Sequence, residues 1–559
     1  MDRILRIFGK EYVNINQAAL LLGLFASLSQ ILGLFRDRAI AHFIGPSPLL
    51  DAYYAAFRVP DFIFISIASL VSITVLIPFI LEKNKGENVS NEAKKFLNDI
   101  FTVFLAVIIF VSIAAFFLMP YLTSIIAPGF SLPMQNKVVE LSRIMLLSPI
   151  LLGLSNLFGT VTQLFRKFFI YALSPIFYNF GIIIGILFLY PIFGIHGLVF
   201  GVVLGALMHF LIQAFSSIRC GFAPHLEWGI NFEDIKKTIL VSLPRTLGLS
   251  FNNIALILIV SFASYLESGS ISVFNFSFNL QSVPLGIIGL SYAVAAFPTL
   301  TRSYAFGKID EFRDHLQSAA RAIIFWSLPV TFLFIVLRAQ IVRVILGSGS
   351  FSWENTRLVA AGLALFSISI MAQGLIALFA RAYYARGDTY RPLLINFFSS
   401  IFIVIFSILL IYIFNHYSGF KYFIESALKV SNIPGTDVLM LPLSYSLGTV
   451  INFILLWFFT RKDFVRKDRS LFKIFTQSLS ASFFIGLTAY ISLNIFSPIF
   501  GTTTFFGVFL QGFISGILGI LAGILVLHLF KNEELKDIAK ALKTKFWRAK
   551  VIASPQEGL

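Results

Sequence analysis

The chain has 559 residues, of which 57% are hydrophobic and only 13% are charged, and its formal net charge is +16. Soluble domains have about a quarter of their residues charged, so this composition excludes a water-soluble protein and indicates a membrane protein. The single cysteine, Cys220, excludes a disulfide framework and a cysteine metal site.

Long apolar runs recur along the whole chain and predict an all-α polytopic membrane protein. Runs such as Ile100 to Leu118 lack the period of two that membrane β-strands show. About fourteen segments reach the roughly 20 residues that a spanning helix needs. They begin near residues 15, 52, 99, 140, 168, 195, 238, 272, 319, 357, 392, 438, 472 and 503. Met1 to Val13 is basic and has no small-residue cleavage site, so we expect the first span to be retained.

The connections between these segments alternate in charge. Lys83 to Lys95 follow the second span and Arg461 to Lys473 follow the twelfth, whereas Pro191 to Gly197, on the opposite side, contain no Lys or Arg. Because Lys and Arg gather in cytoplasmic loops, we predict that both termini are cytoplasmic.

A cluster of charged and polar residues lies at the end of the first span and along the second. Its members are Gln30, Arg36, Asp37, Arg38, Asp51, Arg58 and Asp61. Arginine at membrane depth costs about 2.5 to 3.5 kcal/mol, so these side chains should face a partner or a wet cavity. Guanidinium groups hold phosphate well, which suggests a cationic chamber for a phosphorylated lipid headgroup. The alternative is that the three aspartates neutralise the arginines, or that Arg36 and Arg38 reach the membrane interface.

Two other signals are weaker. Glu140 and Arg143 lie at helix-pair spacing near a span boundary, and we expect them to form an ion pair. His209 and His528 are each alone in an apolar run, and we expect core histidines with their hydrogen bonds satisfied.

An internal repeat is indicated by Pro175 to Asn179 in the fifth span and Pro392 to Asn396 in the eleventh. A similar shift lays Phe57-Arg58 on Phe278-Asn279, and chance placement of proline is the alternative. Because the shift passes through an even number of spans, the two halves have the same orientation. In transporters the substrate site lies between such halves.

The predicted organisation has four parts. Residues 1–220 form an N-terminal lobe, residues 221–465 a C-terminal lobe, and residues 466–530 two additional spanning helices. The basic tail, residues 531–559, places Leu535, Ile538, Leu542 and Phe546 on one helical face. We expect this amphipathic helix to lie on the membrane surface, where anchoring to anionic headgroups is favoured over binding a partner.

Enzyme motifs are absent from the sequence. It has no Gly-rich phosphate loop, no H-E-x-x-H and no nucleophile elbow, and the cytoplasmic loops are too short for a nucleotide-binding domain. We therefore predict a transporter that uses a gradient or none, with no cofactor, no metal and no nucleic-acid partner.

Several stretches resemble one known family. Ser29 to Asp37 and Asp51 to Pro60 resemble the first two spans of the MurJ (MviN) lipid II flippases, and Ser242 to Thr301 and Tyr383 to Pro392 are similar again. The resemblance implies fourteen helices of the multidrug/oligosaccharidyl-lipid/polysaccharide (MOP) exporter superfamily, in two parallel-repeat lobes around a central cationic cavity. It implies that lipid II, the undecaprenyl-pyrophosphate-linked peptidoglycan precursor, moves from the cytoplasmic to the outer leaflet by alternating access.

The resemblance also implies the setting and the partners. We expect a multi-pass protein of the bacterial cytoplasmic (inner) membrane that serves peptidoglycan biosynthesis and cell shape. Its partners would be lipid II or a related polyprenyl-pyrophosphate glycolipid, membrane lipids and, transiently, the cell-wall synthesis machinery. The last two spans, about residues 472 to 530, would hold the lipid tail.

Carried over by motif, Arg36 and Arg58 would bind the headgroup, and Asp37, Arg38, Asp51 and Asp61 would form a gate or charge network. Gln30 and Asn279 stand where family members usually have arginine, so we expect them to contact substrate as neutral donors. Each lost charge should weaken anion binding by about 1 kcal/mol or more. Phe64 replaces another usual arginine, and Ile259 stands where some members have a carboxylate associated with a cation.

These departures leave rival functions open. An exporter of another polyprenyl-pyrophosphate-linked oligosaccharide would tolerate a changed set of headgroup contacts. A transport-inactive membrane scaffold would tolerate loss of the arginines altogether. A drug exporter is disfavoured, because arginines would repel cationic drugs.

Overall fold

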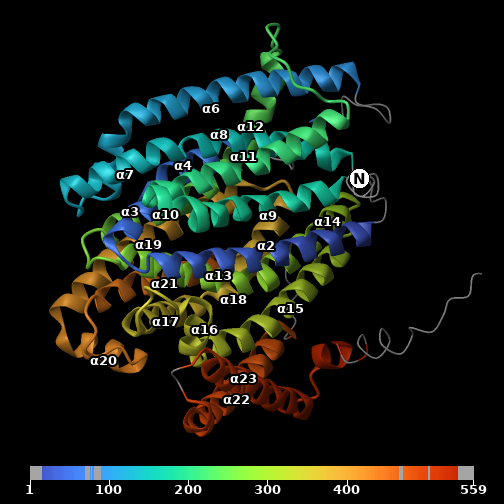
Figure 1. Cartoon of the computed structure of the whole chain (residues 1–559). Helices are drawn as coiled ribbons and strands as arrows, with labels where there is room; N and C mark the ends of the chain where they lie inside the picture. The colour runs from blue at the N-terminus through green and yellow to red at the C-terminus, as the bar shows by residue number, and fades with distance from the viewer. Residues whose placement is uncertain are drawn as a thin grey trace, which may run out of the picture. The chain divides into compact units, whose positions relative to one another are not determined.

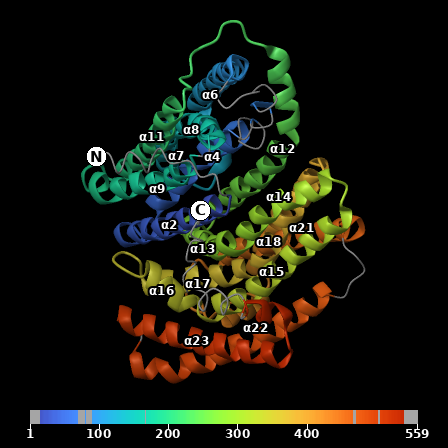
Figure 2. The ribbon, with the colours of Figure 1, turned by 90° about the vertical axis from the view of Figure 1, so that its right-hand side faces the viewer.

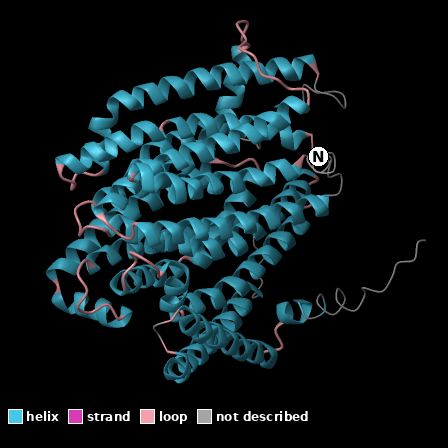
Figure 3. Cartoon of the chain, in the orientation of Figure 1, coloured by secondary structure: helices cyan, strands magenta, loops and turns pink. Residues whose placement is uncertain are grey.

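The computed structural model is built from helices and describes residues 15–68, 76, 79–80, 90–165, 167–464, 470–501, 504–538 and 540. No strand occurs among these residues (Figure 3). Within the same ranges, eleven helices are long and apolar enough to cross a membrane, or twelve if Trp353–Ser367 and Ile370–Ala385 make one bent span. This confirms an all-α polytopic membrane protein. The total of fourteen spans and the cytoplasmic termini stay predictions, and much of the second predicted span lies outside the described residues.

The helices group into two compact units. Unit 1 comprises Met1–Val283, Val342–Ser369 and Gly387–Leu456. Unit 2 comprises Pro284–Ile341, Ile370–Arg386 and Trp457–Leu559. The residue boundaries of these units differ from those of the two predicted lobes, and the lobes stay a prediction.

Unit 1 contains the N-terminal helices and much of the second half of the chain. Its first helices are α2 (Ile15–Phe43), α3 (Pro48–Ala56), α4 (Arg58–Ile63), the π-helix η1 (Phe64–Ala68), α6 (Asn91–Ile126), α7 (Leu132–Met145), α8 (Leu147–Leu164) and α9 (Phe168–Ile184). They are followed by the π-helix η2 (Gly185–Leu189), α10 (Tyr190–Phe193), α11 (Ile195–Arg219), α12 (Phe232–Ala263) and α13 (Ser270–Pro284). Later in the chain come α17 (Trp353–Ser367), α19 (Tyr390–His416), α20 (Ser418–Leu428), the 3-10 helix η4 (Thr436–Leu439) and most of α21 (Met440–Phe464).

Helix α9 packs between α2 and α11 in unit 1 (Figure 1). The segment formed by α9 and η2 lies close to α11 because glycines meet there: Gly181 of α9 and Gly185 of η2 face Gly205 and Gly201. An added Cβ at any of the four would overlap backbone atoms of the neighbouring helix. Small residues at such crossings let membrane helices gain van der Waals contact. On the neighbouring helix α8, Ser155 Oγ contacts His209 Nδ1 at 2.7 Å, so His209 is hydrogen-bonded as expected, and it is half-buried. The expectation of a core histidine is wrong for His528, which is exposed.

Replacing Gly201 with valine is expected to lower the thermal stability of the purified protein, because the new side chain meets the backbone of Gly185. Overpacking of this kind costs typically about 1 to 3 kcal/mol. The control is Gly23→Val on α2, where an added Cβ has nothing within 4 Å. Equal unfolding temperatures for the two variants in detergent would contradict the close packing of the α9–η2 segment on α11.

Unit 2 is built around α15. Its helices are the π-helix η3 (Leu285–Leu290), α14 (Ser291–Ala305), α15 (Ile309–Val336), the first part of α16 (Arg338–Leu346), α18 (Ile370–Ala385), α22 (Ser470–Phe500) and α23 (Phe505–Leu529). Helices α22 and α23 form a hairpin, and α22 also packs on α15 (Figure 2). Gly519 and Gly523 of α23 lie against Ile485 of α22, so the hairpin is tightly packed.

The start of the tail is attached to α15 through acidic residues. Arg321 Nε contacts Glu534 Oε1 at 2.6 Å and Arg321 Nη2 contacts Glu533 Oε2 at 2.9 Å. The hydrogen bond from Arg321 and the nearby charge of Lys473 lower the pKa of Glu533 from its ordinary value, so this carboxylate keeps its charge to lower pH than a free glutamate does. Residues 533–538 are helical, as predicted, with Leu535 and Ile538 half-buried. Leu542 and Phe546 lie outside the described residues, and membrane anchoring stays a prediction.

Candidate functional site

The turn between α2 and α3 places the first residues of the site. Gly45 has a φ of 63°, a conformation that favours glycine, and lets the chain reverse after α2. Ser47 caps α3, its Oγ accepting from Leu50 N at 3.3 Å, and Pro48 occupies a first-turn position that needs no N–H donor. Asp51 therefore enters the first turn of α3, where its side chain is buried.

Asp51 binds the beginning of α13. Its Oδ2 accepts from Gly269 N at 2.7 Å, and its Oδ1 accepts from Ser272 N at 2.7 Å and Ser272 Oγ at 2.5 Å. Backbone N–H groups at a helix start lack helical partners and carry partial positive charge, so a carboxylate is well placed there. Asp51 thus ties α3 to α13, and among the described residues no ion pair joins it to an arginine, as the neutralising alternative would require.

Arg36 is shared between an acid and an amide. Its Nε and Nη2 donate to Asp37 Oδ1 at 3.0 and 2.8 Å, and its Nη1 donates to Asn179 Oδ1 of α9 at 3.2 Å. Asn179 in turn donates to Ser29 Oγ at 3.2 Å. The neutralising alternative raised by the sequence therefore applies to Arg36 and Asp37.

Asn279 of α13 completes this group, since its Nδ2 donates to Asp37 Oδ2 at 3.0 Å. Asp37 is 3% exposed and has its two oxygens occupied by Arg36 and Asn279. Asn279 thus lies at the arginine cluster, where its amide points at an aspartate of the protein, and its contact with substrate stays a prediction. An arginine at position 279 would add a second cation beside the same carboxylate.

Arg58 is the least satisfied cation of the cluster. It begins α4, and its Nη2 donates to Asn275 Oδ1 at 2.9 Å. Its Nε is buried without a hydrogen-bond partner among the described residues. A buried N–H of a charged group that lacks a partner is costly, so this guanidinium is a natural place for an anionic ligand.

The remaining predicted residues lie around this group with different roles. Arg38 Nη1 donates to the backbone oxygens of Val344 and Ile345 at 2.6 and 3.1 Å, so it holds α2 to α16. Asp61, one turn after Arg58, is exposed. Gln30 is half-buried, and no side-chain hydrogen bond of Gln30 occurs within the described part of the chain.

Two residues of the site were not predicted as site residues. In the sequence, Asn179 stands out only through the repeated Pro-x-x-x-Asn pattern, and Asn275 belongs to none of the motifs described above. Each receives a hydrogen bond from one arginine of the cluster. A usable signal existed for Asn275, because it lies one helical turn before Asn279 and so shares its face.

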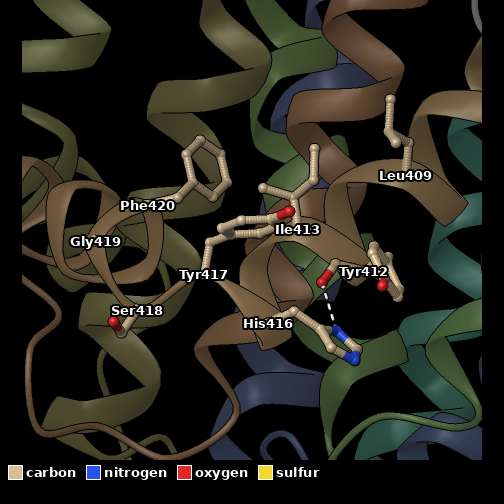
Figure 4. A pocket seen from close by; sticks show the side chains of 8 residues that line it. All are labelled: Leu409, Tyr412, Ile413, His416, Tyr417, Ser418, Gly419 and Phe420. Atoms are coloured by element: carbon tan, nitrogen blue, oxygen red, sulfur yellow. Dashed lines mark hydrogen bonds between the residues drawn. The ribbon is translucent and has the colours of Figure 1, made fainter.

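A separate hollow of about 740 Å³ lies at the end of α19 (Figure 4). There the rings of Tyr412 and His416 stack at 4.1 Å, and His416 Nδ1 donates to the backbone oxygen of Tyr412 at 2.9 Å. None of the described residues that line it is charged. This hollow therefore offers no cation for a phosphorylated ligand, and the arginine cluster remains the candidate site.

Comparison with known proteins gives a consistent result. The family model described as "Lipid II flippase MurJ" matches residues 40–421, which begin just after Arg38. A "Probable lipid II flippase MurJ" of Buchnera aphidicola subsp. Acyrthosiphon pisum is 27% identical over 410 residues, 72% of this chain and 80% of its own length. Its counterpart in Rickettsia prowazekii is 28% identical over 393 residues, 69% of this chain and 76% of its own length.

Solved structures show the same fold. The structure titled "Lipid II flippase MurJ, inward closed conformation" superposes with a TM-score of 0.73 at 22% identity and covers 93% of this chain and 100% of its own. An inward-facing multidrug resistance MATE family transporter of the MOP superfamily has a TM-score of 0.62 at 16% identity and covers 81% of this chain and 99% of its own.

Proposed function

The chain belongs to the MurJ family of lipid II flippases, and from this premise we propose that it carries lipid II from the cytoplasmic to the outer leaflet by alternating access. It is a transporter and not an enzyme, and it is a multi-pass protein of the bacterial inner membrane. The role in peptidoglycan biosynthesis follows from the substrate.

The observation that supports a site for the pyrophosphate best is the incomplete hydrogen bonding of Arg58. Its Nε is buried with no partner in the described part of the chain, and only Nη2 is engaged, by Asn275. Pyrophosphate oxygens are strong acceptors that can take two parallel N–H donors from one guanidinium. We therefore assign the principal headgroup contact to Arg58.

Arg36 has a secondary part in this proposal. Because Asp37 and Asn179 already occupy it, a headgroup would have to compete with these partners or share the guanidinium. Asn279 acts here by holding Asp37, and Gln30 is the more available of the two neutral donors. These assignments rest on the distances given above.

Asp51 fits the role of a gate residue. Its three hydrogen bonds join α3 to the start of α13, and they involve no arginine. Separation of these two helices requires loss of all three bonds, so their formation favours a closed arrangement at this end of the helices. The lipid-tail groove at residues 472–530 and contact with the cell-wall synthesis machinery stay predictions.

The test of the proposed function is complementation in bacteria depleted of their only lipid II flippase. We expect the wild-type chain to restore growth and peptidoglycan synthesis, because family membership extends over most of the chain. Membrane levels are matched by immunoblotting, and an empty vector is the control. Correct insertion without rescue would contradict lipid II as the substrate and favour another polyprenyl-pyrophosphate-linked oligosaccharide.

A further inference from the structure

A groove of about 480 Å³ lies on unit 1 between α6 and the α7–α8 segment. Most of its wall is apolar and consists of Ile109, Ile113, Phe116, Phe117, Leu146, Leu147 and Ile150. Ile113, Phe117 and Leu147 are exposed, and both walls belong to candidate membrane spans. Exposed apolar residues on spanning helices contact lipid, so the groove is open to the hydrocarbon part of the bilayer.

Arg143 of α7 lines this groove and is held in place by a break in the hydrogen bonding of α6. Pro120 lies inside α6 and has no N–H, so the carbonyl four residues earlier, that of Phe116, loses its helical donor. Arg143 Nε supplies the missing hydrogen bond at 3.0 Å, and its guanidinium lies 4.6 Å from the centroid of the Phe116 ring. The arginine is therefore fixed by its Nε and by one face of its guanidinium.

The Nη groups of Arg143 donate to no group of the described residues. The expected ion pair with Glu140 is wrong, because Glu140 instead contacts Lys137 at 2.9 Å and His196 at 2.7 Å. Within the described part of the chain, the only hydrogen bond of Arg143 is the one from Nε to Phe116. A guanidinium in a spanning segment costs free energy when it has no anionic partner. A negatively charged group that accepts hydrogen bonds from the Nη groups would lower this cost.

A second group without a hydrogen-bond partner among the described residues lies on α6, one helical turn before Phe116. Ser112 is 5% exposed and lines the groove, and its Oγ has no hydrogen-bond partner among the described residues. Ile109 lies three residues before Ser112 and also lines the groove. Along α6 the groove therefore presents a cation near Phe116, then a hydroxyl, then an apolar wall.

This order matches the chemistry of one class of molecule. A phospholipid has a phosphate, then ester carbonyls, then acyl chains, in the same succession. We propose that the groove binds one anionic phospholipid, with its phosphodiester on the Nη groups of Arg143, an ester carbonyl accepting from Ser112 Oγ, and an acyl chain along Ile109 and Ile113. The occupant is a bilayer lipid and not a soluble phosphate, because the apolar wall needs a hydrocarbon partner. The site is independent of the arginine cluster that we assign to the headgroup of lipid II.

The test is native mass spectrometry of the full-length protein in detergent, titrated with dioleoyl-phosphatidylglycerol. We expect Arg143→Gln to weaken the first binding step about tenfold, since it removes charge-assisted hydrogen bonds. The matched control is Arg219→Gln on unit 1, whose guanidinium also lies over a phenylalanine, 4.2 Å from the centroid of Phe215. Equal affinities for wild type and Arg143→Gln would overturn the proposal.

Two further variants keep the test valid if Arg143→Gln unfolds. Ser112→Ala should weaken binding about threefold through loss of one hydrogen bond. Ile113→Trp, at an exposed position, should fill the groove and weaken binding while Arg143 stays in place. Unchanged binding in both variants would contradict a lipid in this groove.

Three other probes identify the ligand. We expect the Arg143 dependence to be strong for phosphatidylglycerol and weak for phosphatidylcholine, whose ammonium group balances the phosphate, and absent for inorganic phosphate. A dependence seen only with undecaprenyl phosphate would overturn the assignment to a bilayer phospholipid. These assays measure phospholipid binding to the purified protein, whereas complementation measures lipid II flipping in cells. Failure of this site and failure of the proposed function are therefore distinguishable.

Discussion

Replacing Arg58 with alanine is expected to abolish rescue of cells depleted of their lipid II flippase, at an unchanged level of the protein in the membrane. Hydrogen bonds to charged groups contribute about 1.5 to 3 kcal/mol each, so losing a bidentate contact with pyrophosphate should cost about 3 to 6 kcal/mol. A difference of about 1.4 kcal/mol is tenfold in affinity, which makes the expected loss a hundredfold or more. Binding of lipid II to the purified protein measures the same loss directly.

Two companion variants identify the cause of that loss. Arg58→Lys keeps the charge but not the planar fork of donors, so we expect partial rescue. Asn275→Ala removes the protein partner of Arg58 and leaves the guanidinium in place, so we expect a milder defect than with Arg58→Ala. Arg219→Ala, at the end of α11, is the control for loss of an arginine elsewhere on unit 1. Full rescue by Arg58→Ala would show that the headgroup is bound without this residue.

Replacing Asp51 with alanine is expected to lower the free energy of unfolding by about 2 to 4 kcal/mol, since it leaves two buried backbone N–H groups without acceptors. These are the N–H groups of Gly269 and Ser272 at the beginning of α13. Thermal unfolding of the purified protein measures the effect. Ser272→Ala is the matched control, because it removes one hydrogen bond and keeps both backbone contacts, so its effect should be clearly smaller.

The same Asp51→Ala variant tests the gate. A cysteine introduced as Ser270→Cys, at a buried position at the beginning of α13, in a Cys220→Ser background free of other cysteines, reports access to the segment that Asp51 holds. We expect a membrane-impermeant maleimide added to whole cells to label this cysteine faster in Asp51→Ala than with Asp51 intact. Equal labelling rates, with a lowered unfolding temperature, would show that Asp51 stabilises the fold without controlling access.

The fold class was predictable because the information for it is local. A long apolar run must be a helix in lipid whatever its neighbours are, since every backbone polar group needs an internal partner there. The turn signals around Gly45, Ser47 and Pro48 also act locally, and the helices end and begin there in the structure. The residues carrying the cluster, Arg36 and Arg58, stood out for the same reason, because charge within an apolar run is visible in a single stretch of sequence.

The partners of these residues were decided by tertiary structure alone. Arg36 contacts Asn179, 143 residues away, and Arg38 contacts Val344, 306 residues away. No local pattern fixes which helix faces another, so Glu140 was paired with the wrong cation and Asp51 was expected among arginines. Burial then set the outcome, because a buried carboxylate or guanidinium takes whatever donors or acceptors the neighbouring helix presents. The sequence by itself thus determined the helices and the charged residues within them. The packing of the helices decided which charges are neutralised, and it leaves the buried Nε of Arg58 without a hydrogen-bond partner among the residues that the structure describes.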